Sequence, residues 1–321
     1  MRSRNRLRAS VLLALMHLLV GDAAASQEAR VVAWVERYFE EAANSRSLRP
    51  QAGELATHPW LLIEEADKRL KSTNTKVVRA AILLYDLVGR RSDNLLLRQA
   101  CVSRLLGAAS AWASEGFDGD ARRKSLVSDC VGLASQYRTE DFVELARAQI
   151  VRIASRWPTR YTIRLVGVGG AQDALPWLAT LVDDSRLGWA SRMTRARLGV
   201  DSEVDYVVAV LVEKAHRKPQ SRGDVARELD FIQNEKARDA LIDLALTIDE
   251  VQNANTDAHP NIYHAGFFLG HLVGYMPEMP NPYSEDDIAK QFFAYNGDAV
   301  RNARDWVRKW RDGDGAREPR K

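Results

Sequence analysis

The sequence predicts an all-α protein built from antiparallel helix pairs that stack on one another. Two observations lead to this prediction. Apolar residues recur at intervals of three and four through nearly the whole chain, which is the spacing of one face of an α-helix. Apolar pairs twelve residues apart also recur at a nearly constant distance along the chain. No segment alternates strictly between apolar and polar residues, so we expect no strands.

The amino-terminal residues have the layout of a secretory signal peptide. Arginines at alternate positions in residues 2–8 precede an apolar run over residues 11–20, which Asp22 and the small residues 23–25 follow. A membrane-spanning helix needs roughly 20 apolar residues, so a cleaved signal is favoured over a permanent anchor. We predict cleavage after Ala25, a periplasmic or secreted protein, and no stable membrane insertion after cleavage.

The composition separates this chain from disordered and nucleic-acid-binding proteins. Its 321 residues are 46% hydrophobic, enough for a large core. The whole chain has 46 basic and 43 acidic residues, but residues 1–25 hold four Arg and one Asp, so the remainder is formally neutral. A nucleic-acid-binding surface requires basic residues in the folded part, and none is therefore expected as a partner.

The two cysteines, Cys101 and Cys130, leave two alternatives open. Each lies on the apolar stripe of its own predicted helix, and adjacent antiparallel helices could bring them together as a disulfide in an oxidising compartment. The alternative is a pair of buried, reduced thiols that pack in the core.

The repeat consists of four apolar pairs, each separated by twelve residues. Their first members lie 33, 32 and 31 residues apart, so one unit is about 32 residues long, enough for two short helices and two turns. The pairs are Leu133 and Leu145, Val166 and Leu178, Leu198 and Val210, and Leu229 and Leu241.

One stretch carries a family resemblance. Residues 166–178, VGVGGAQDALPWL, resemble the helix-turn-helix of the HEAT-repeat family in its short, PBS-lyase-type form, and residues 196–199 and 229–241 repeat parts of it. Two positions depart from the family pattern: Ala171 stands where an acidic turn residue is common, and Asp230 where Gly167 and Gly199 stand in the other units. The resemblance implies an α-solenoid, and it implies fold far more strongly than activity.

The predicted solenoid covers residues 26–310, with the clearest repeats in 120–250. Five apolar and aromatic residues near the amino end indicate the helix that caps the stack, and five more near the carboxyl end indicate a last amphipathic helix. These residues are Val31, Trp34, Val35, Tyr38 and Phe39 at the first end, and Val300, Ala303, Trp306, Val307 and Trp310 at the second. Residues 311–321 are predicted to be a disordered tail.

The region 249–283 departs from the repeat and is the first candidate for binding. A polar loop over 250–260 precedes a predicted helix, one stripe of which would face a partner protein. The other interpretation is an inner helix that buries its aromatics and leaves its histidines hydrogen-bonded. The candidate partner-binding residues are His264, Phe267, Phe268, His271 and Tyr275.

Two further candidates are weaker. Arg192 and Arg195 belong to a run of basic residues that stacking could align against an acidic partner, or that could form a solvated helix face. His259, His264 and His271 could approach one another as metal ligands, but paired ligands on a helix are usually one turn apart and no carboxylate completes the set.

No catalytic motif or cofactor-binding loop is present in the sequence. We therefore expect a non-catalytic exported scaffold, adaptor, inhibitor or immunity-type protein that binds another protein with a solenoid surface and needs no cofactor. The alternative is a metal-dependent hydrolase, or another enzyme, with its site near His259, His264 and His271.

Overall fold

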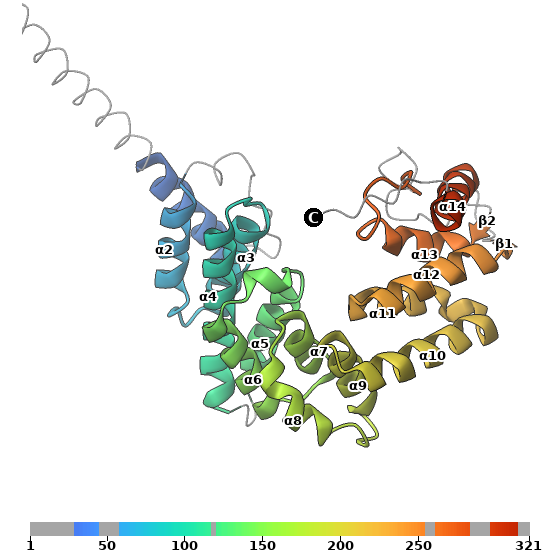
Figure 1. The fold of residues 1–321 in the computed structure, drawn as a ribbon. Coiled ribbons are helices and arrows are strands. Elements are labelled where there is room, and N and C mark those ends of the chain that lie inside the picture. Colours follow the sequence, from blue (N-terminus) through green and yellow to red (C-terminus); the bar gives the residue numbers. More distant parts are fainter. Residues whose placement is uncertain (1–28, 45–57, 117–119, 254–260, 283–295, 314–321) are drawn as a thin grey trace, which may run out of the picture. The chain divides into compact units, whose positions relative to one another are not determined.

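The computed structural model describes residues 29–44, 58–116, 120–253, 261–282 and 296–313. Over these ranges the chain is helical except for one short pair of strands (Figure 1). It divides into two compact units, residues 1–171 and 172–321. The all-α fold class is therefore confirmed, whereas the predicted signal peptide lies outside the described residues.

The first unit begins with a helix over residues 29–44, the predicted amino-terminal cap. Val31, Val35 and Phe39 are buried there, and the Tyr38 hydroxyl donates to the Ala80 carbonyl oxygen at 3.1 Å. The elements that follow are α2 (Pro59–Arg69), α3 (Thr75–Arg90), α4 (Leu95–Ser114), α5 (Ala121–Ala134), the 3-10 turn η1 (Thr139–Asp141), α6 (Glu144–Arg156) and α7 (Arg160–Val168).

The starts of α3 and α4 are encoded by the same short sequence, Ser-x-Asn. The Asn74 side chain accepts a hydrogen bond from the Lys76 amide at 3.0 Å, and the Asn94 side chain accepts from the Leu96 amide at 3.0 Å. Each caps amide groups that the first helical turn leaves without partners. In turn, Ser92 accepts from the Asn94 amide at 3.0 Å, which fixes the chain just before α4.

The helices of the first unit pack on their second neighbours along the chain. Besides contacts between most consecutive helices, α2 packs on α4, α3 on α5, α4 on α6 and α5 on α7 (Figure 1). Contacts between second neighbours along the chain therefore extend through the described part of the first unit.

The second unit repeats this arrangement. Here α9 packs on α11, α10 on α12, α11 on α13 and α12 on α14. Its elements are η2 (Gln172–Ala174), α8 (Leu175–Ala179), α9 (Gly188–Arg197), α10 (Asp201–Arg217), η3 (Pro219–Ser221), α11 (Arg222–Ile232), α12 (Glu235–Thr247), β1 (Val251–Asn253), β2 (Asn261–Tyr263), α13 (Ala265–Leu272) and α14 (Gly297–Asp312).

The last predicted helix is confirmed as α14. Val300, Ala303 and Val307 are buried, and Trp306 and Trp310 pack against the core of the second unit. The boundary predicted at residue 310 is two residues too early, because Arg311 still belongs to the helix and forms an ion pair with Asp243 at 2.9 Å. The rest of the predicted tail, residues 314–321, lies outside the described residues.

The expectation of no strands is wrong at one place. Strands β1 and β2 pair antiparallel, with Val251 opposite Tyr263 and Asn253 opposite Asn261. Ile262, which the sequence places on the core face of a helix, lies in β2, and α13 begins only at Ala265. The apolar spacing of residues 262–276 matches a helix, but pairing with β1 satisfies the backbone of 261–263 instead.

The repeat is less regular than the predicted period of about 32 residues. Helices α9 and α11 begin 34 residues apart, whereas α3 and α5 begin 46 residues apart because α4 between them is 20 residues long. Leu145, a member of one predicted core pair, is 63% exposed. The constant spacing therefore describes part of the chain, not every helix pair.

Two of the predicted repeat turns are nonetheless closed in the same way. Gly170 follows α7 with φ +67°, and Gly199 follows α9 with φ +87°. The Ala171 amide donates to Val166 O at 3.1 Å, and the Val200 amide donates to Arg195 O at 3.0 Å. This hydrogen bond, together with a left-handed glycine, is a common helix ending, and it explains the glycine at both positions.

Candidate functional site

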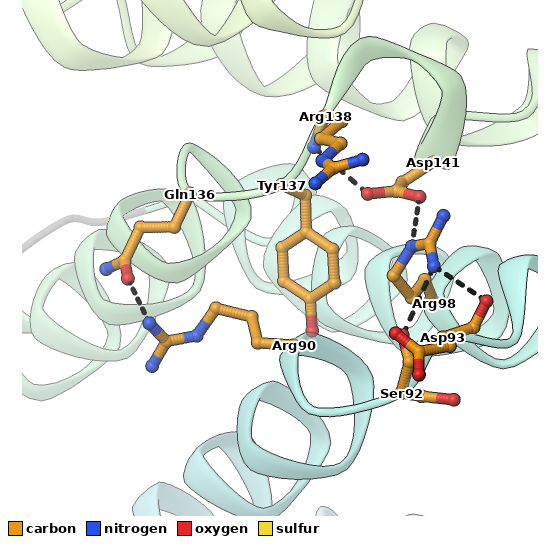
Figure 2. A pocket seen from close by; sticks show the side chains of 8 residues that line it. All are labelled: Arg90, Ser92, Asp93, Arg98, Gln136, Tyr137, Arg138 and Asp141. Atoms are coloured by element: carbon orange, nitrogen blue, oxygen red, sulfur yellow. Dashed lines mark hydrogen bonds and ion pairs between the residues drawn. The ribbon is translucent and has the colours of Figure 1, made fainter. Parts of the chain in front are cut away.

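A polar pocket of about 230 Å³ lies at one end of the helices of the first unit (Figure 2). Three segments form it: the end of α3 with the start of α4, the loop that follows α5, and η1. Three guanidinium groups and two carboxylates are among its lining groups. The lining residues are Arg90, Ser92, Asp93, Arg98, Gln136, Tyr137, Arg138 and Asp141.

Arg98 pairs with the buried Asp141 in this pocket. Arg98 Nε donates to Asp141 Oδ1 at 2.7 Å, and its Nη1 donates to the carbonyl oxygens of Ser92 at 3.2 Å and Asp93 at 3.1 Å. The other Asp141 oxygen accepts from the Arg138 amide at 3.0 Å. The hydrogen bond to Asp141 raises the pKa of Arg98. This pair therefore joins the start of α4 to η1 and is largely satisfied within the protein.

Arg90 and Tyr137 form the opposite side. Arg90 Nη1 donates to Gln136 Oε1 at 2.6 Å, and its Nη2 forms an ion pair with Asp86 one turn earlier in α3. Figure 2 shows the Tyr137 ring between Arg90 and Gln136 on one side and Arg98 and Asp141 on the other. Burial raises the pKa of the Tyr137 hydroxyl, so this side chain adds no charge to the pocket that it lines.

Asp86, the ion-pair partner of Arg90, is buried. Burial raises the pKa of its carboxyl group, and the hydrogen bond and charge of Arg90 oppose that rise. Among the described residues, Asp86 Oδ1 finds no hydrogen-bond partner. Arg90 is therefore held by a carboxylate that has no other donor in contact.

Of the three arginines that line the pocket, Arg138 has the most N–H groups available to an added acceptor. Its side chain is 79% exposed, and its ion pair with Glu140 spans 3.7 Å, longer than a hydrogen bond. A guanidinium carries five N–H donors in a planar fork that matches a carboxylate. The pocket can therefore present solvent-exposed donors to an acceptor group, although Asp93 and Glu140 reduce the net positive charge near it.

The predicted partner-binding patch on residues 264–275 is wrong for two of its members. His264 and Phe268 are buried in the second unit, Phe268 completely, so neither side chain is accessible to another protein. Phe267 is partly buried, and its ring lies where a Cβ on Gly223 would contact it at 3.4 Å. The interpretation of an inner helix describes these residues better, since α11, α12 and α14 all pack on α13.

The remaining members of that patch bond to the end of α11. His271 Nδ1 lies 3.0 Å from Asp230 Oδ2, and the Tyr275 hydroxyl donates to the Asp230 carbonyl oxygen at 3.3 Å. Asp230, which departs from the glycine of the repeat pattern, thus holds the segment around α13.

Arg192 and Arg195 bind an acidic residue of their own unit. Arg192 lies 3.1 Å and Arg195 3.5 Å from the carboxylate oxygens of Glu203, and Arg192 also covers the Tyr206 ring with 4.9 Å to its centroid. Glu203 is buried at the start of α10. Both arginines therefore join α9 to α10, which is a structural use of the basic run.

The three histidines of the metal alternative do not form a ligand set that the structure describes. His264 Nδ1 lies 2.7 Å from Arg222 Nη1, and its Nε2 lies 3.3 Å from Gln252 Oε1, so both nitrogens have protein partners. His271 bonds to Asp230, and His259 lies outside the described residues. Within the described ranges, no three His, Cys, Asp or Glu side chains are grouped as metal ligands.

Cys101 and Cys130 are both buried and are not bonded to each other, which matches the packed-thiol alternative. Burial raises the pKa of Cys101 to about 12 and raises the pKa of Cys130 as well. Neither thiol is therefore ionised near neutral pH.

Sequence reasoning missed the pocket because its residues come from separate segments, over 90–98 and 136–141. The nearest signal was Val88-Gly89 followed by Asp93, which marks the turn between α3 and α4 that forms one wall. Ion pairs such as that of Arg98 with Asp141, 43 residues apart, decide which arginine still has N–H groups available to a partner. Such pairs can be recognised only in the tertiary structure.

No helix in the described ranges combines the length and hydropathy that crossing a bilayer requires. Neither a protein-family model, nor a curated protein, nor a solved structure matches the chain.

Proposed function

We propose that this protein is a non-catalytic, exported scaffold of HEAT-like repeats that binds another protein and takes an acceptor group of that partner, such as a carboxylate, into the pocket of the first unit. The observation that carries the proposal is the pocket itself, where Arg138 presents solvent-exposed donors beside the ordered Arg98–Asp141 pair. A carboxylate held by a guanidinium makes charge-assisted hydrogen bonds, which are about twice as strong as neutral ones.

The packing pattern supports the repeat part of the proposal. In each unit the helices contact their second neighbours along the chain, as they do when helix pairs stack into a solenoid. Such a stack exposes the turns between its helices along an edge, and the pocket is formed by turns of this kind. The exposed Leu95 and Leu96, at the start of α4 beside Asp93, add apolar surface close to it.

The binding site is tested by charge reversal with a matched control. Arg138→Glu reverses the pocket arginine that has donors to spare, and Arg122→Glu reverses an exposed arginine at the start of α5 in the same unit. Both variants and the wild type are used as bait against an envelope extract of the source cells, and retained proteins are quantified by mass spectrometry. We expect a protein that the wild type and Arg122→Glu retain equally and that Arg138→Glu retains at least about tenfold less, since one charge-assisted hydrogen bond contributes about 1.5–3 kcal/mol.

Equal retention by all three baits would refute the pocket as the binding site. Export is tested separately by the intact mass of the protein recovered from its own cells. A chain that begins near Ser26 supports export, and a full-length chain in the cytoplasm contradicts it.

A further inference from the structure

The side chain of Arg222 is buried although it carries a permanent charge. It is 2% exposed, at the first residue of α11. Its Nε donates to the Ala215 carbonyl oxygen of α10 at 3.0 Å, and its two terminal nitrogens donate to the Glu250 carboxylate at 2.7 Å and 2.9 Å. This bidentate pairing joins α11 to the residue that precedes β1, and it compensates the charge in the way buried arginines require.

A third residue in contact with Arg222 is His264, which is 3% exposed and directly follows β2. Its Nδ1 lies 2.7 Å from Arg222 Nη1. An arginine can only donate, so Nδ1 must be the acceptor and carry no proton. Nε2 then carries the hydrogen and donates to Gln252 Oε1 in β1 at 3.3 Å. The hydrogen-bond network therefore assigns His264 to the neutral, Nε2-protonated form.

These contacts hold a strand pair that has little other support of its own. Each strand is three residues long, and an isolated two-stranded ribbon is marginally stable at best. The His264 amide donates to the Glu250 carbonyl oxygen at 3.1 Å, which closes the ribbon beside Arg222. On its other side, Tyr263 packs against α14, with the Arg301 guanidinium 5.9 Å from the centre of its ring.

We propose that Arg222, Glu250 and His264 form an acid-sensitive latch, which holds the strand pair β1–β2 on α11 at neutral pH and releases it when His264 takes up a proton. Protonation would place an N–H on Nδ1, where it would face the donors of Arg222 at 2.7 Å. Two cations would then share one buried site, while Glu250, the carboxylate that faces them among the described residues, is already engaged by Arg222 through both of its oxygens.

The electrostatic surroundings agree with this geometry. Burial and the charge of Arg222 lower the pKa of His264, and Glu250 opposes them with a smaller effect. Within the part of the chain that the structure describes, the charged groups that face His264 are Arg222 from α11 and Glu250 before β1. The other packed elements contribute neutral groups: the Ala215 carbonyl from α10, the Gln252 amide from β1 and the Phe267 ring from α13, whose centroid is 5.9 Å from that of His264. The position of the latch in the second unit makes it independent of the proposed pocket in the first.

The test is amide hydrogen exchange of residues 250–253 and 261–264 between pH 7.5 and 5.0, with each rate corrected for its intrinsic pH dependence. Three full-length proteins are compared: the wild type, His264→Gln, whose side-chain oxygen can still accept from Arg222 but takes up no proton, and His271→Gln as the control histidine, which lies in α13. Opening that takes up one proton becomes more favourable by about tenfold for each pH unit between the pKa values of His264 in the open and closed states.

We expect corrected exchange of the strand pair to rise in this way in the wild type and in His271→Gln, and to stay constant in His264→Gln. No rise in the wild type, or an equal rise in His264→Gln, would overturn the latch. If His264→Gln fails to fold, the wild type alone decides: NMR titration of the His264 ring must have the same midpoint as the rise in exchange, and two different midpoints would also overturn it.

Discussion

At the scale of single residues, the buried charge of Arg222 joins three segments of the second unit. Arg222 is almost completely inaccessible, yet its partner Glu250 is more than half exposed. Such a pair contributes little net stability compared with an apolar replacement of the same shape, but losing one member leaves the other with unmet hydrogen bonds. The pair therefore selects one arrangement of α10, α11 and β1 rather than adding greatly to stability.

A substitution of Arg222 tests this constraint. We expect Arg222→Met to lower the free energy of unfolding by about 3 kcal/mol, because the buried groups Ala215 O and His264 Nδ1 lose their donor. The measurement is urea unfolding at pH 7.5. The control, Arg227→Met, changes an exposed arginine of the same helix and should shift the free energy by less than about 0.5 kcal/mol. Equal effects of the two variants would contradict the role of Arg222.

The lowered pKa of His264 predicts the pH dependence of stability. The folded protein binds a proton at His264 less readily than the unfolded chain, whose histidine has its ordinary pKa of 6.5. The stabilising contribution is therefore complete above pH 6.5 and is lost as the pH falls toward the folded-state pKa, with a slope of at most about 1.4 kcal/mol per pH unit. Unfolding free energies of the wild type minus those of His264→Gln, measured from pH 7.5 to 5.0, should show this slope, while effects of carboxylates common to both proteins cancel. A difference that stays constant with pH would contradict the assignment.

At the scale of elements, a glycine permits a close approach that a residue with a side chain would prevent. A Cβ on Gly89, near the end of α3, would lie 2.1 Å from the Tyr137 hydroxyl oxygen and 2.9 Å from Cys101 Cβ. Tyr137 and the end of α3 also line the pocket, so this close approach sets its width. By contrast, a Cβ on Gly132 in α5 would meet nothing within 4 Å.

The two glycines give opposite predictions for the same substitution. Gly89→Ala should destabilise the protein by about 1–3 kcal/mol, because α3 and Tyr137 must move apart. Gly132→Ala should stabilise it by about 0.5–1 kcal/mol, because alanine favours the helix and fits without strain. Thermal or urea unfolding of both variants checks this, and a stabilising Gly89→Ala would show that the contact with Tyr137 is looser than described.

At the scale of the whole molecule, each of the two units has its own core. Residues from α9 to α14 form one continuous buried cluster that includes Leu211, Leu229, Leu241 and Phe268. In the first unit, the helices from α2 to α7 pack on their neighbours and bury a separate set of residues. Local stability can therefore differ between the units, because the free energy of local opening varies across a structure.

This organisation predicts that a substitution acts mainly on its own unit. In native-state hydrogen exchange, Arg222→Met should lower the protection of α10 to α13, and Gly89→Ala that of α3 to α5, each with little effect on the other unit. An equal loss of protection over residues 58–253 in both variants would instead show that the chain unfolds as one cooperative body.

By itself the sequence determined the fold class, the cap helix before residue 44 and the amphipathic helix around Trp306, because helical periodicity and capping residues are local signals. Only tertiary structure decided which polar residues remain available. Phe268 and His264 have the pattern of an exposed face but are covered by helices on several sides, and Arg192 and Arg195 are used by Glu203. Strand β2 replaced the start of a predicted helix because β1 offered it partners, and the pocket exists because residues up to 51 positions apart meet in the first unit. Burial and pairing depend on contacts between distant residues, which the spacing of residues along one helix does not encode.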